Sequence, residues 1–320
     1  MKILGLIVVA VVGLVGQCHG ALQVGFYNGK CGTKDVESMV QGVVAQRFKS
    51  DNTIVAALLC LQFHDCFVSG CDASLLLDGT SSEKNAPPNL SVRGYDIINQ
   101  AKAAVEAACP ELVSCADIIA LAARDAVSLA GGRSYAVQTG RRDALFPATN
   151  VNLPGPSISV SQAISAFKSK GLSTNDMVLL LGAHTVGVTH CPLFQNRLYN
   201  FNNTGKPDPT MNPTLASQLR TVCPNASPPQ NTAVNLDQNA SSAFIVDNDY
   251  YKQILSKRGI LQIDQALALD SATRTSVMVL AASNPLFSIG FGNAMVKMGA
   301  LQILTGTQGQ VRKVCNVANG

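Results

Sequence analysis

Ten cysteines limit the folds open to this 320-residue chain more than any other feature. One of them, Cys18, lies in an N-terminal segment that we predict to be removed, so nine remain. In an oxidising compartment eight cysteines can form four disulfides, and the ninth must stay a free thiol or pair with another chain. Composition does not decide which cysteine is left over. The nine are Cys31, Cys60, Cys66, Cys71, Cys109, Cys115, Cys191, Cys223 and Cys315.

The N-terminal segment has the layout of a secretory signal. Lys2 precedes an apolar run at 3–15, and the small residues Gly20 and Ala21 follow it. The run is shorter than the roughly 18 apolar residues that a membrane span needs, and no later segment qualifies. We therefore predict a signal peptide at 1–20 and an exported, soluble product of residues 21–320, which suits one large domain or two packed lobes.

The charge pattern argues against a nucleic-acid partner. The formal net charge is +4, and no dense stripe of Lys and Arg appears. This mild positive charge is compatible with weak binding to an acidic cell-wall polysaccharide. We expect a monomer that has no membrane partner.

The periodicity of apolar residues predicts a mainly α chain with few strands. Residues 99–108 and 115–129 have helical spacing, and Gly131 and Gly132 follow the second segment where a left-handed cap would end it. Residues 55–67 read as a buried helix that carries His64.

A further helix should begin at Ser173, because Ser173 and Asp176 form a capping pattern before the apolar run 177–181. His184 would then lie on the third turn of this helix. Proline-rich residues 140–157 and residues 202–229 are predicted loops.

Histidines are scarce, so few of them are candidates for a catalytic or metal-ligating residue. His19 belongs to the predicted signal, so the mature chain keeps His64, His184 and His190. A lone histidine in an apolar helix is more often a packed core residue than a ligand. The sequences around His64 and His184 nevertheless favour a functional role for these two histidines.

Two segments carry a specific resemblance. Residues 63–74 read FHDCFVSGCDAS, and residues 181–187 read LGAHTVG after Asp176. Shorter motifs recur in order along the chain, namely FY at 26–27, VSCAD at 113–117, GRRD at 140–143 and GTQGQ at 306–310. Together they resemble the class III plant (secretory) haem peroxidases over essentially the whole mature chain.

The resemblance implies two helical lobes that sandwich haem b, a distal lobe of about 21–150 plus the C-terminal end and a proximal lobe of about 151–300. His184 would ligate the haem iron, and Asp264 would accept a hydrogen bond from its second ring nitrogen, which makes the imidazole a stronger donor to iron. The alternative for Asp264 is a simple helix N-cap.

On the distal side, the resemblance makes His64 the acid–base residue and Asn89 the partner that keeps it basic. The alternative for Asn89 is a turn residue. Phe63 would shield the pocket, and Pro154 would lie near the haem edge where aromatic donors bind.

Cys60 departs from the family pattern. It stands four residues before His64, where the family carries a catalytic arginine. A neutral thiol is a weak donor, and loss of one preorganised donor costs on the order of 10²- to 10³-fold in rate. We expect reduced activity; inert helix packing, a sequence error and redox sensing stay open for Cys60.

Two calcium sites are implied by the resemblance. The distal site would use side-chain or carbonyl oxygens of Asp65, Val68, Gly70, Asp72 and Ser74. The proximal site would use Thr185, Asp237, Ser242, Ile245 and Asp247, although the loop 237–247 is two residues longer than the family pattern.

The resemblance also implies the disulfides Cys31–Cys109, Cys66–Cys71, Cys115–Cys315 and Cys191–Cys223. Cys60 is then the unpaired cysteine, at a position expected to be buried in a helix. Sequons at Asn202, Asn225 and Asn239 predict glycosylation.

Three functions remain to be compared. We rank a peroxidase that oxidises phenolic donors with H2O2 first, a weakened haem-binding pseudo-peroxidase second, and a non-haem structural protein of the cell wall third. The chain stops five residues after Cys315, which favours the cell wall over the vacuole.

Overall fold

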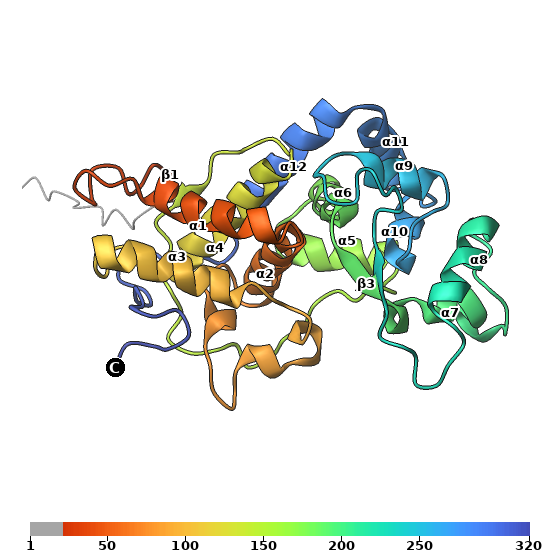
Figure 1. Cartoon of the computed structure of the whole chain (residues 1–320), viewed down its shortest axis with the longest axis horizontal. Helices are drawn as coiled ribbons and strands as arrows, with labels where there is room; N and C mark the ends of the chain where they lie inside the picture. The colour runs from red at the N-terminus through yellow and green to blue at the C-terminus, as the bar shows by residue number, and fades with distance from the viewer. Residues whose placement is uncertain (1–21) are drawn as a thin grey trace, which may run out of the picture.

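The computed structural model describes residues 22–320, so the predicted signal peptide lies outside the described residues. This part of the chain contains twelve α-helices and four short strands, and the expected mainly α class is confirmed (Figure 1). The helices are α1 (Val36–Ser50), α2 (Ile54–Val68), α3 (Tyr95–Ala108), α4 (Cys115–Leu129), α5 (Val160–Ser169), α6 (Thr174–Leu181), α7 (Gln195–Tyr199), α8 (Pro213–Val222), α9 (Asp249–Leu255), α10 (Gln262–Leu267), α11 (Arg274–Ala282) and α12 (Asn284–Met298).

The strands form two small antiparallel pairs. β1 (Gln23–Val24) pairs with β2 (Gln138–Thr139), and β3 (Val188–His190) pairs with β4 (Ala233–Asn235). Each pair joins two segments that are far apart in the sequence, and neither pair forms a hydrophobic core of its own. No helix within residues 22–320 combines the length and apolar character that crossing a bilayer requires.

The first half of the chain packs around α4. Helices α1, α2 and α3 all contact α4, and nearly every side chain of α4 is buried. Ser114 caps its first turn by accepting from the Asp117 N–H, and Gly131 follows its end with φ +83°, a conformation that glycine adopts without strain. These four helices lie together at one side of Figure 1.

The second half contains α5 to α11, with α7 and α8 at the far side of Figure 1. Helix α12 packs against α6 and α11 and also contacts α2 from the first half. It therefore connects the helix that carries His64 with the one that leads to His184.

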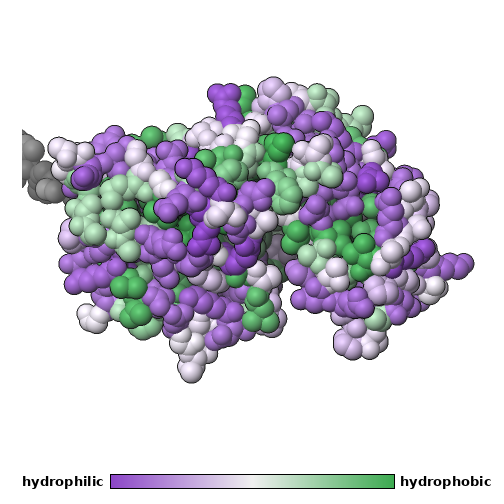
Figure 2. Space-filling view, viewed as in Figure 1, coloured by the Kyte–Doolittle hydropathy of each residue, from purple (hydrophilic) through white to green (hydrophobic). Residues whose placement is uncertain are grey.

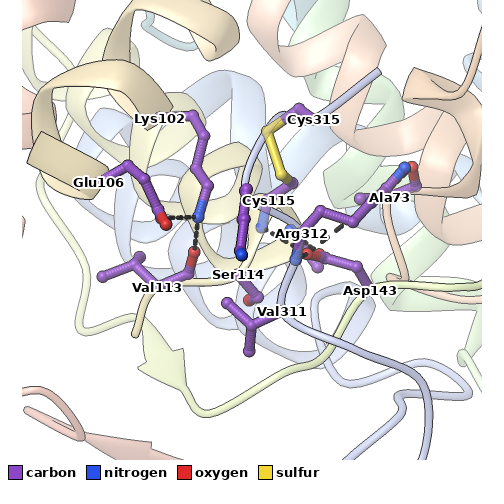
Figure 3. Close-up of a disulfide and its surroundings, with 12 residues drawn as sticks. Ala73, Lys102, Glu106, Val113, Ser114, Cys115, Asp143, Val311, Arg312 and Cys315 are labelled. Carbon is purple, nitrogen blue, oxygen red and sulfur yellow. Dashed lines mark hydrogen bonds and ion pairs between the residues drawn. A yellow bond between two sulfur atoms is a disulfide. The ribbon is translucent and has the colours of Figure 1, made fainter. Parts of the chain in front are cut away.

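The C-terminal segment returns to the first half of the chain. Asp143 and Gln310 exchange backbone hydrogen bonds, and Cys315 is joined to Cys115 at the start of α4 (Figure 3). The buried Asp143 carboxylate accepts from the backbone N–H groups of Cys115, Ala116 and Arg312. One carboxylate thus caps α4 and fixes the last segment of the chain.

The structure joins eight cysteines in four disulfides, Cys31–Cys109, Cys66–Cys71, Cys115–Cys315 and Cys191–Cys223. Among residues 22–320, Cys60 is the one free cysteine. It is partly buried in α2 and packs against the core.

The predicted loop 202–229 was wrong in part, because it contains helix α8, which begins at Pro213 after the N-cap Asn212. The boundaries of the predicted helices differ modestly. Helix α3 begins four residues before the predicted start at 99, directly after Gly94 with φ +100°. Helix α2 is one residue longer at each end than the predicted 55–67. The capping box of Ser173 and Asp176 is present at the start of α6, as predicted.

The position of His184 is a correction. Helix α6 ends at Leu181, and His184 lies in the 3₁₀ turn η4 (Gly182–Thr185) instead of a third α-helical turn. Such tightening is common at helix ends. The segment is closely packed, because a Cβ on Gly182 would lie 2.3 Å from the Tyr251 hydroxyl.

Candidate active site

One face of α2 is left open in an otherwise buried helix. Ala56, Cys60, Phe63 and His64 are partly exposed, whereas the other residues from 54 to 67 are buried. Their spacing places them along a single stripe, because residues three and four apart lie on the same helix face. This stripe is apolar except for the imidazole and the thiol.

A second open surface lies on the neighbouring segment of the second half. Leu181, Ala183 and His184 are partly exposed, and the His184 side chain is 29% exposed although its surroundings are core residues. Helix α2 contacts η4, and Gly187 comes so close that a Cβ on it would lie 2.6 Å from the Ala56 Cβ. Figure 2 shows the surface notched between the two halves of the molecule.

His184 is held by a buried carboxylate. Its Nδ1 lies 2.9 Å from Asp264 Oδ1, and the Tyr250 hydroxyl donates to the same oxygen at 2.9 Å. Because a carboxylate only accepts, Nδ1 carries the hydrogen and Nε2 is left as a lone-pair donor. Burial lowers the pKa of His184, but the Asp264 charge and hydrogen bond outweigh it and the pKa is raised overall.

His64 is held by an amide in a similar way. Its Nδ1 lies 2.7 Å from Asn89 Oδ1, and the Asn89 amide nitrogen donates to the Glu83 carbonyl at 2.8 Å. This second bond fixes the amide orientation, so Nδ1 of His64 donates and Nε2 stays free to accept a proton. The pKa of His64 is lowered overall, because burial lowers it more than the Asn89 hydrogen bond raises it. The lowered pKa favours the neutral imidazole.

Cys60 lies one helical turn before His64 on the same face. Burial raises the pKa of its thiol to about 11, so the sulfur is protonated and uncharged at neutral pH. The nearby Tyr95 hydroxyl is buried without a hydrogen-bond partner. This part of the site therefore offers weak, neutral donors, at the position where the sequence resemblance implied an arginine.

Phe63 begins an aromatic cluster beside His64. Its ring centroid lies 4.8 Å from that of Phe67, which in turn lies 4.8 Å from that of Phe167. Phe67 also lines a surface pocket of about 520 Å³ whose wall includes Pro154. The two residues predicted to contact substrate, Phe63 and Pro154, are thus connected through Phe67.

The last turn of α2 and the loop that follows it contain buried oxygen atoms that lack partners. Asp65 Oδ1 and Ser74 Oγ are buried without a hydrogen-bond partner, and Asp72 Oδ1 accepts from the Ser74 N–H at 2.9 Å. Burial raises the pKa of both aspartates, and Asp72 raises that of Asp65 further. Unpaired buried oxygens are costly, and a bound cation would offset that cost.

The backbone of this loop is tightly constrained. The Cys66–Cys71 disulfide closes it, and Gly70 adopts φ +120° where a Cβ would lie 2.4 Å from the Gln302 carbonyl oxygen. Within residues 22–320, no three His, Cys, Asp or Glu side chains gather as a metal-binding group. An ion here would need hydroxyl and carbonyl oxygens as well, which suits calcium.

The five residues predicted for the proximal cation site also lie near one another. Thr185 Oγ1 is 3.3 Å from both Asp247 Oδ1 and the Ile245 carbonyl oxygen, and Ser242 donates to Asp237 at 2.6 Å. Burial raises the pKa of Asp237, and the charge of Asp247 adds to this effect. The longer loop still brings oxygens of Ile245 and Asp247 to Thr185, which directly follows His184.

Two contacts were missed by sequence reasoning. Tyr250 reinforces Asp264, and the Glu83 carbonyl orients Asn89. Neither carries a local sequence signal, because one is a tyrosine in a short buried helix and the other acts through its backbone. Asp264 lies on the third residue of α10 and Leu261 is the N-cap, so the N-cap alternative for Asp264 was wrong.

A helical protein that holds two histidines with free Nε2 atoms beside an apolar gap is suited to bind a flat, metal-bearing cofactor. Comparison with known proteins specifies the class further. Residues 40–283 match the family model described as Peroxidase. The chain belongs to the peroxidase family, and its resemblance to the class III plant peroxidases is confirmed. Membership in this family implies haem and calcium as cofactors.

The relatives match over almost their whole lengths. Peroxidase 57 of Arabidopsis thaliana is 52% identical over 299 residues, which cover 93% of this chain and 93% of the relative. Peroxidase 44 of the same plant is 52% identical over 303 residues, with 93% of each chain covered. Peroxidase 5 of Vitis vinifera is 45% identical over 310 residues, which cover 95% of this chain and 93% of the relative.

Proposed function

We propose that this chain is a secreted haem peroxidase that oxidises small phenolic donors with H2O2. One observation carries the proposal: His64 and His184 are each fixed through Nδ1 to a buried acceptor, so both present a free Nε2 from neighbouring segments that line an apolar gap. Each lobe would contribute one histidine, the distal lobe of about 21–150 plus the C-terminal end and the proximal lobe of about 151–300.

The residues around the gap fit one haem b. His184 Nε2 would ligate the iron, and Ala56, Phe63, Leu181 and Ala183 would contact the ring. Bound haem supplies the two-electron redox chemistry that reduction of peroxide requires. Asp264, supported by Tyr250, makes the His184 imidazole more anionic and a stronger donor.

His64 moves the proton. As a neutral imidazole, it takes a proton at Nε2 from one peroxide oxygen and returns it to the other oxygen, which leaves as water. Asn89 holds the ring in the tautomer that this transfer needs. Phe63 would exclude water beside the imidazole, and Pro154 would border the place where the donor binds.

Cys60 would make this enzyme slower than its relatives. Negative charge develops on the leaving oxygen, and a neutral thiol stabilises it poorly. A weakened haem-binding pseudo-peroxidase is therefore the second candidate, and Cys60 is the observation that favours it.

Two calcium ions would stabilise the site from either side. The distal ion would use Asp65, Val68, Gly70, Asp72 and Ser74, and the proximal ion would use Thr185, Asp237, Ser242, Ile245 and Asp247. Asp65 follows His64 directly and Thr185 follows His184 directly. Each ion would thus hold the backbone next to one of the two histidines.

We place the mature protein in the cell wall as a glycosylated monomer with weak affinity for acidic polysaccharide. Asn202, in the short 3₁₀ turn Phe201–Asn203, and Asn225, in a loop, are exposed, which suits glycan attachment. Asn239 is half-buried and accepts hydrogen bonds from Ser241. The positive net charge supports the attraction to polysaccharide.

The test is H2O2-dependent oxidation of a phenol by the mature chain loaded with haem and calcium. We expect a haem absorption band and turnover in the wild type, loss of the band in His184→Ala, and retention of both in His190→Ala. His190 is the matched control, because it is half-buried in β3 and bonds only the Asn231 carbonyl among the described contacts. A wild-type chain that takes up no haem would overturn the proposal.

A further inference from the structure

The C-terminal segment contacts the loop of the proposed distal calcium site. The Arg312 guanidinium donates from Nη2 to the Ala73 carbonyl at 2.5 Å, across 239 residues of sequence (Figure 3). Farther along the segment, the Asn316 carbonyl accepts from the Asp78 N–H at 3.0 Å, and the Asn316 amide donates to the Asp78 carboxylate at 2.6 Å. The last residues of the chain therefore border the loop from which the distal ion would take its ligands.

Ala73 has an unusual backbone conformation. Its φ is +58°, in the left-handed region, and the 3₁₀ turn η1 (Ser74–Leu76) follows it. A residue other than glycine adopts this conformation at a cost in free energy, so neighbouring contacts must hold it there. Ala73 lies between Asp72 and Ser74, two of the proposed calcium ligands. The left-handed turn at Ala73 thus sets the direction of the chain from one ligand to the next.

Both polar groups of the Ala73 backbone are hydrogen-bonded. The N–H donates to Asp65 Oδ2 at 3.2 Å. The carbonyl accepts from the Leu76 N–H at 3.1 Å and from Arg312. Asp65 and Leu76 are close to Ala73 in sequence, whereas Arg312 is far away. Arg312 is thus the contact that connects the left-handed turn to a separate part of the fold.

Arg312 is itself held firmly in place. Its side chain is fully buried, and its backbone N–H donates to Asp143 Oδ2 at 2.9 Å. Three residues later, Cys315 is bonded to Cys115 at the start of α4 (Figure 3). A side chain fixed in this way loses little further freedom when it holds a neighbouring group, so Arg312 can keep the Ala73 carbonyl in one position.

The charge of Arg312 by itself would oppose calcium binding, because two cations in one region repel each other. Burial of the guanidinium is also incompletely compensated. Its Nε and Nη1 have no hydrogen-bond partner, and Nε lies 3.8 Å from Asp143 Oδ2. The hydrogen bond to Ala73 acts in the opposite direction, because it favours the loop conformation that presents the ligands. The sign of the effect of Arg312 on calcium affinity therefore separates positioning from simple repulsion.

We infer that Arg312 is a positioning residue of the distal calcium site, which holds Ala73 in its left-handed conformation and thereby aligns Asp72 and Ser74 for the ion. The inference rests on the proposed function for the ion itself, and it adds a residue that is remote in sequence from the ligands. Calcium affinity should then depend on docking of the C-terminal segment. Because coupling between two sites is reciprocal, calcium should also strengthen that docking.

The experiment measures calcium affinity by calorimetry on the haem-loaded mature chain after a chelator has removed calcium. The variant Asp72→Ala identifies the part of the titration that belongs to the distal ion. Lys313→Met is the matched control, because it removes the neighbouring cation, which is largely exposed and pairs with exposed Glu111. The test variants are Arg312→Met, Arg312→Lys, Ala73→Gly, and each Arg312 variant combined with Ala73→Gly.

We expect Arg312→Met to weaken binding of the distal ion about tenfold, the size of the cost of a left-handed alanine. Ala73→Gly should restore most of this affinity, because glycine adopts a positive φ without strain, and should change little by itself. Arg312→Lys should lose less than Arg312→Met, because lysine keeps a donor. In the wild type, calcium should slow hydrogen exchange of the amides of residues 311–315.

Unchanged or tighter calcium binding in Arg312→Met would overturn the inference, because repulsion would then outweigh positioning. Failure of Ala73→Gly to restore the affinity, or an equal loss in Lys313→Met, would also overturn it. Circular dichroism checks the fold of each variant. If Arg312→Met does not fold, Arg312→Lys with and without Ala73→Gly decides the same question.

The outcome for the proposed activity is separate. If the variants behave as expected but the wild type shows no turnover with H2O2, the peroxidase proposal fails while the assignment of Arg312 stands. If the wild type turns over H2O2 but Asp72→Ala removes no part of the calcium titration, the assignment of Arg312 fails while the peroxidase proposal stands.

Discussion

Replacing Cys60 with arginine should accelerate the reaction with H2O2. Cys60 lies one turn before His64 on the same partly exposed face of α2, so an arginine there would share that face with the imidazole. With a thiol pKa of about 11, only about one molecule in 10⁴ carries a thiolate at pH 7, and a thiolate would oppose the developing negative charge. The native residue therefore contributes almost no electrostatic stabilisation.

The size of the effect follows from what the arginine adds. One preorganised donor is worth on the order of 10²- to 10³-fold, and a charged donor in a site of low polarity is worth at least as much. The half-buried position of Cys60 leaves the new side chain open space on one side, so packing strain should be small. We expect a gain of several hundred-fold in the second-order rate constant.

The assay is stopped-flow absorption of the haem band after mixing with H2O2, on protein refolded with haem and calcium. Cys60→Ser is the matched control, since it keeps a small neutral side chain and should stay as slow as the wild type. The double variant Cys60→Arg with His64→Ala should lose the gain, because the proton transfer would be missing. Equal, fast rates for wild type and Cys60→Arg would show that another donor replaces the arginine and that our account of this pocket is wrong.

Three further predictions concern the surrounding structure. Asp264→Asn should lower haem affinity about tenfold to a hundredfold in a haem titration, because His184 loses its anionic partner; unchanged affinity would contradict the role of Asp264. Chelation of calcium should lower the thermal midpoint by roughly 5 °C or more, and added calcium should restore it, because Asp65 Oδ1 and Ser74 Oγ then lack a partner; an unchanged midpoint would argue against the distal ion. Burial raises the pKa of Asp125 to about 6, although the neighbouring Arg124 lowers it. The pKa in the folded protein therefore lies above the unfolded value of 3.8. Ionisation of Asp125 then destabilises the fold as the pH rises through 6. Urea unfolding should therefore show Asp125→Asn more stable than wild type at pH 7, by on the order of 1–3 kcal/mol, with the advantage shrinking toward pH 4; an advantage independent of pH would refute this linkage.

Much of the candidate site could be read from the sequence because its residues lie in short contiguous motifs. The segment that contains His64 also contains Asp65, Asp72 and Ser74, so helix and loop geometry alone brings them together. The mainly α class followed from apolar periodicity, and α4 begins and ends at the predicted residues because Ser114 and Gly131 carry local capping signals. Local signals act over one or two turns, and they fail where packing decides, as in the 3₁₀ turn that carries His184.

The sequence by itself indicated the peroxidase family, and it singled out the two histidines and Cys60 as candidate site residues. Its motifs are local, and their chemistry does not depend on distant partners. Only the tertiary structure placed Tyr250 on Asp264, the Glu83 carbonyl on Asn89 and Arg312 at the Ala73 carbonyl. It also placed Cys60 on the partly exposed face of α2 that carries His64. These features depend on which elements pack together, because burial and hydrogen bonding are set by neighbours far away in the chain.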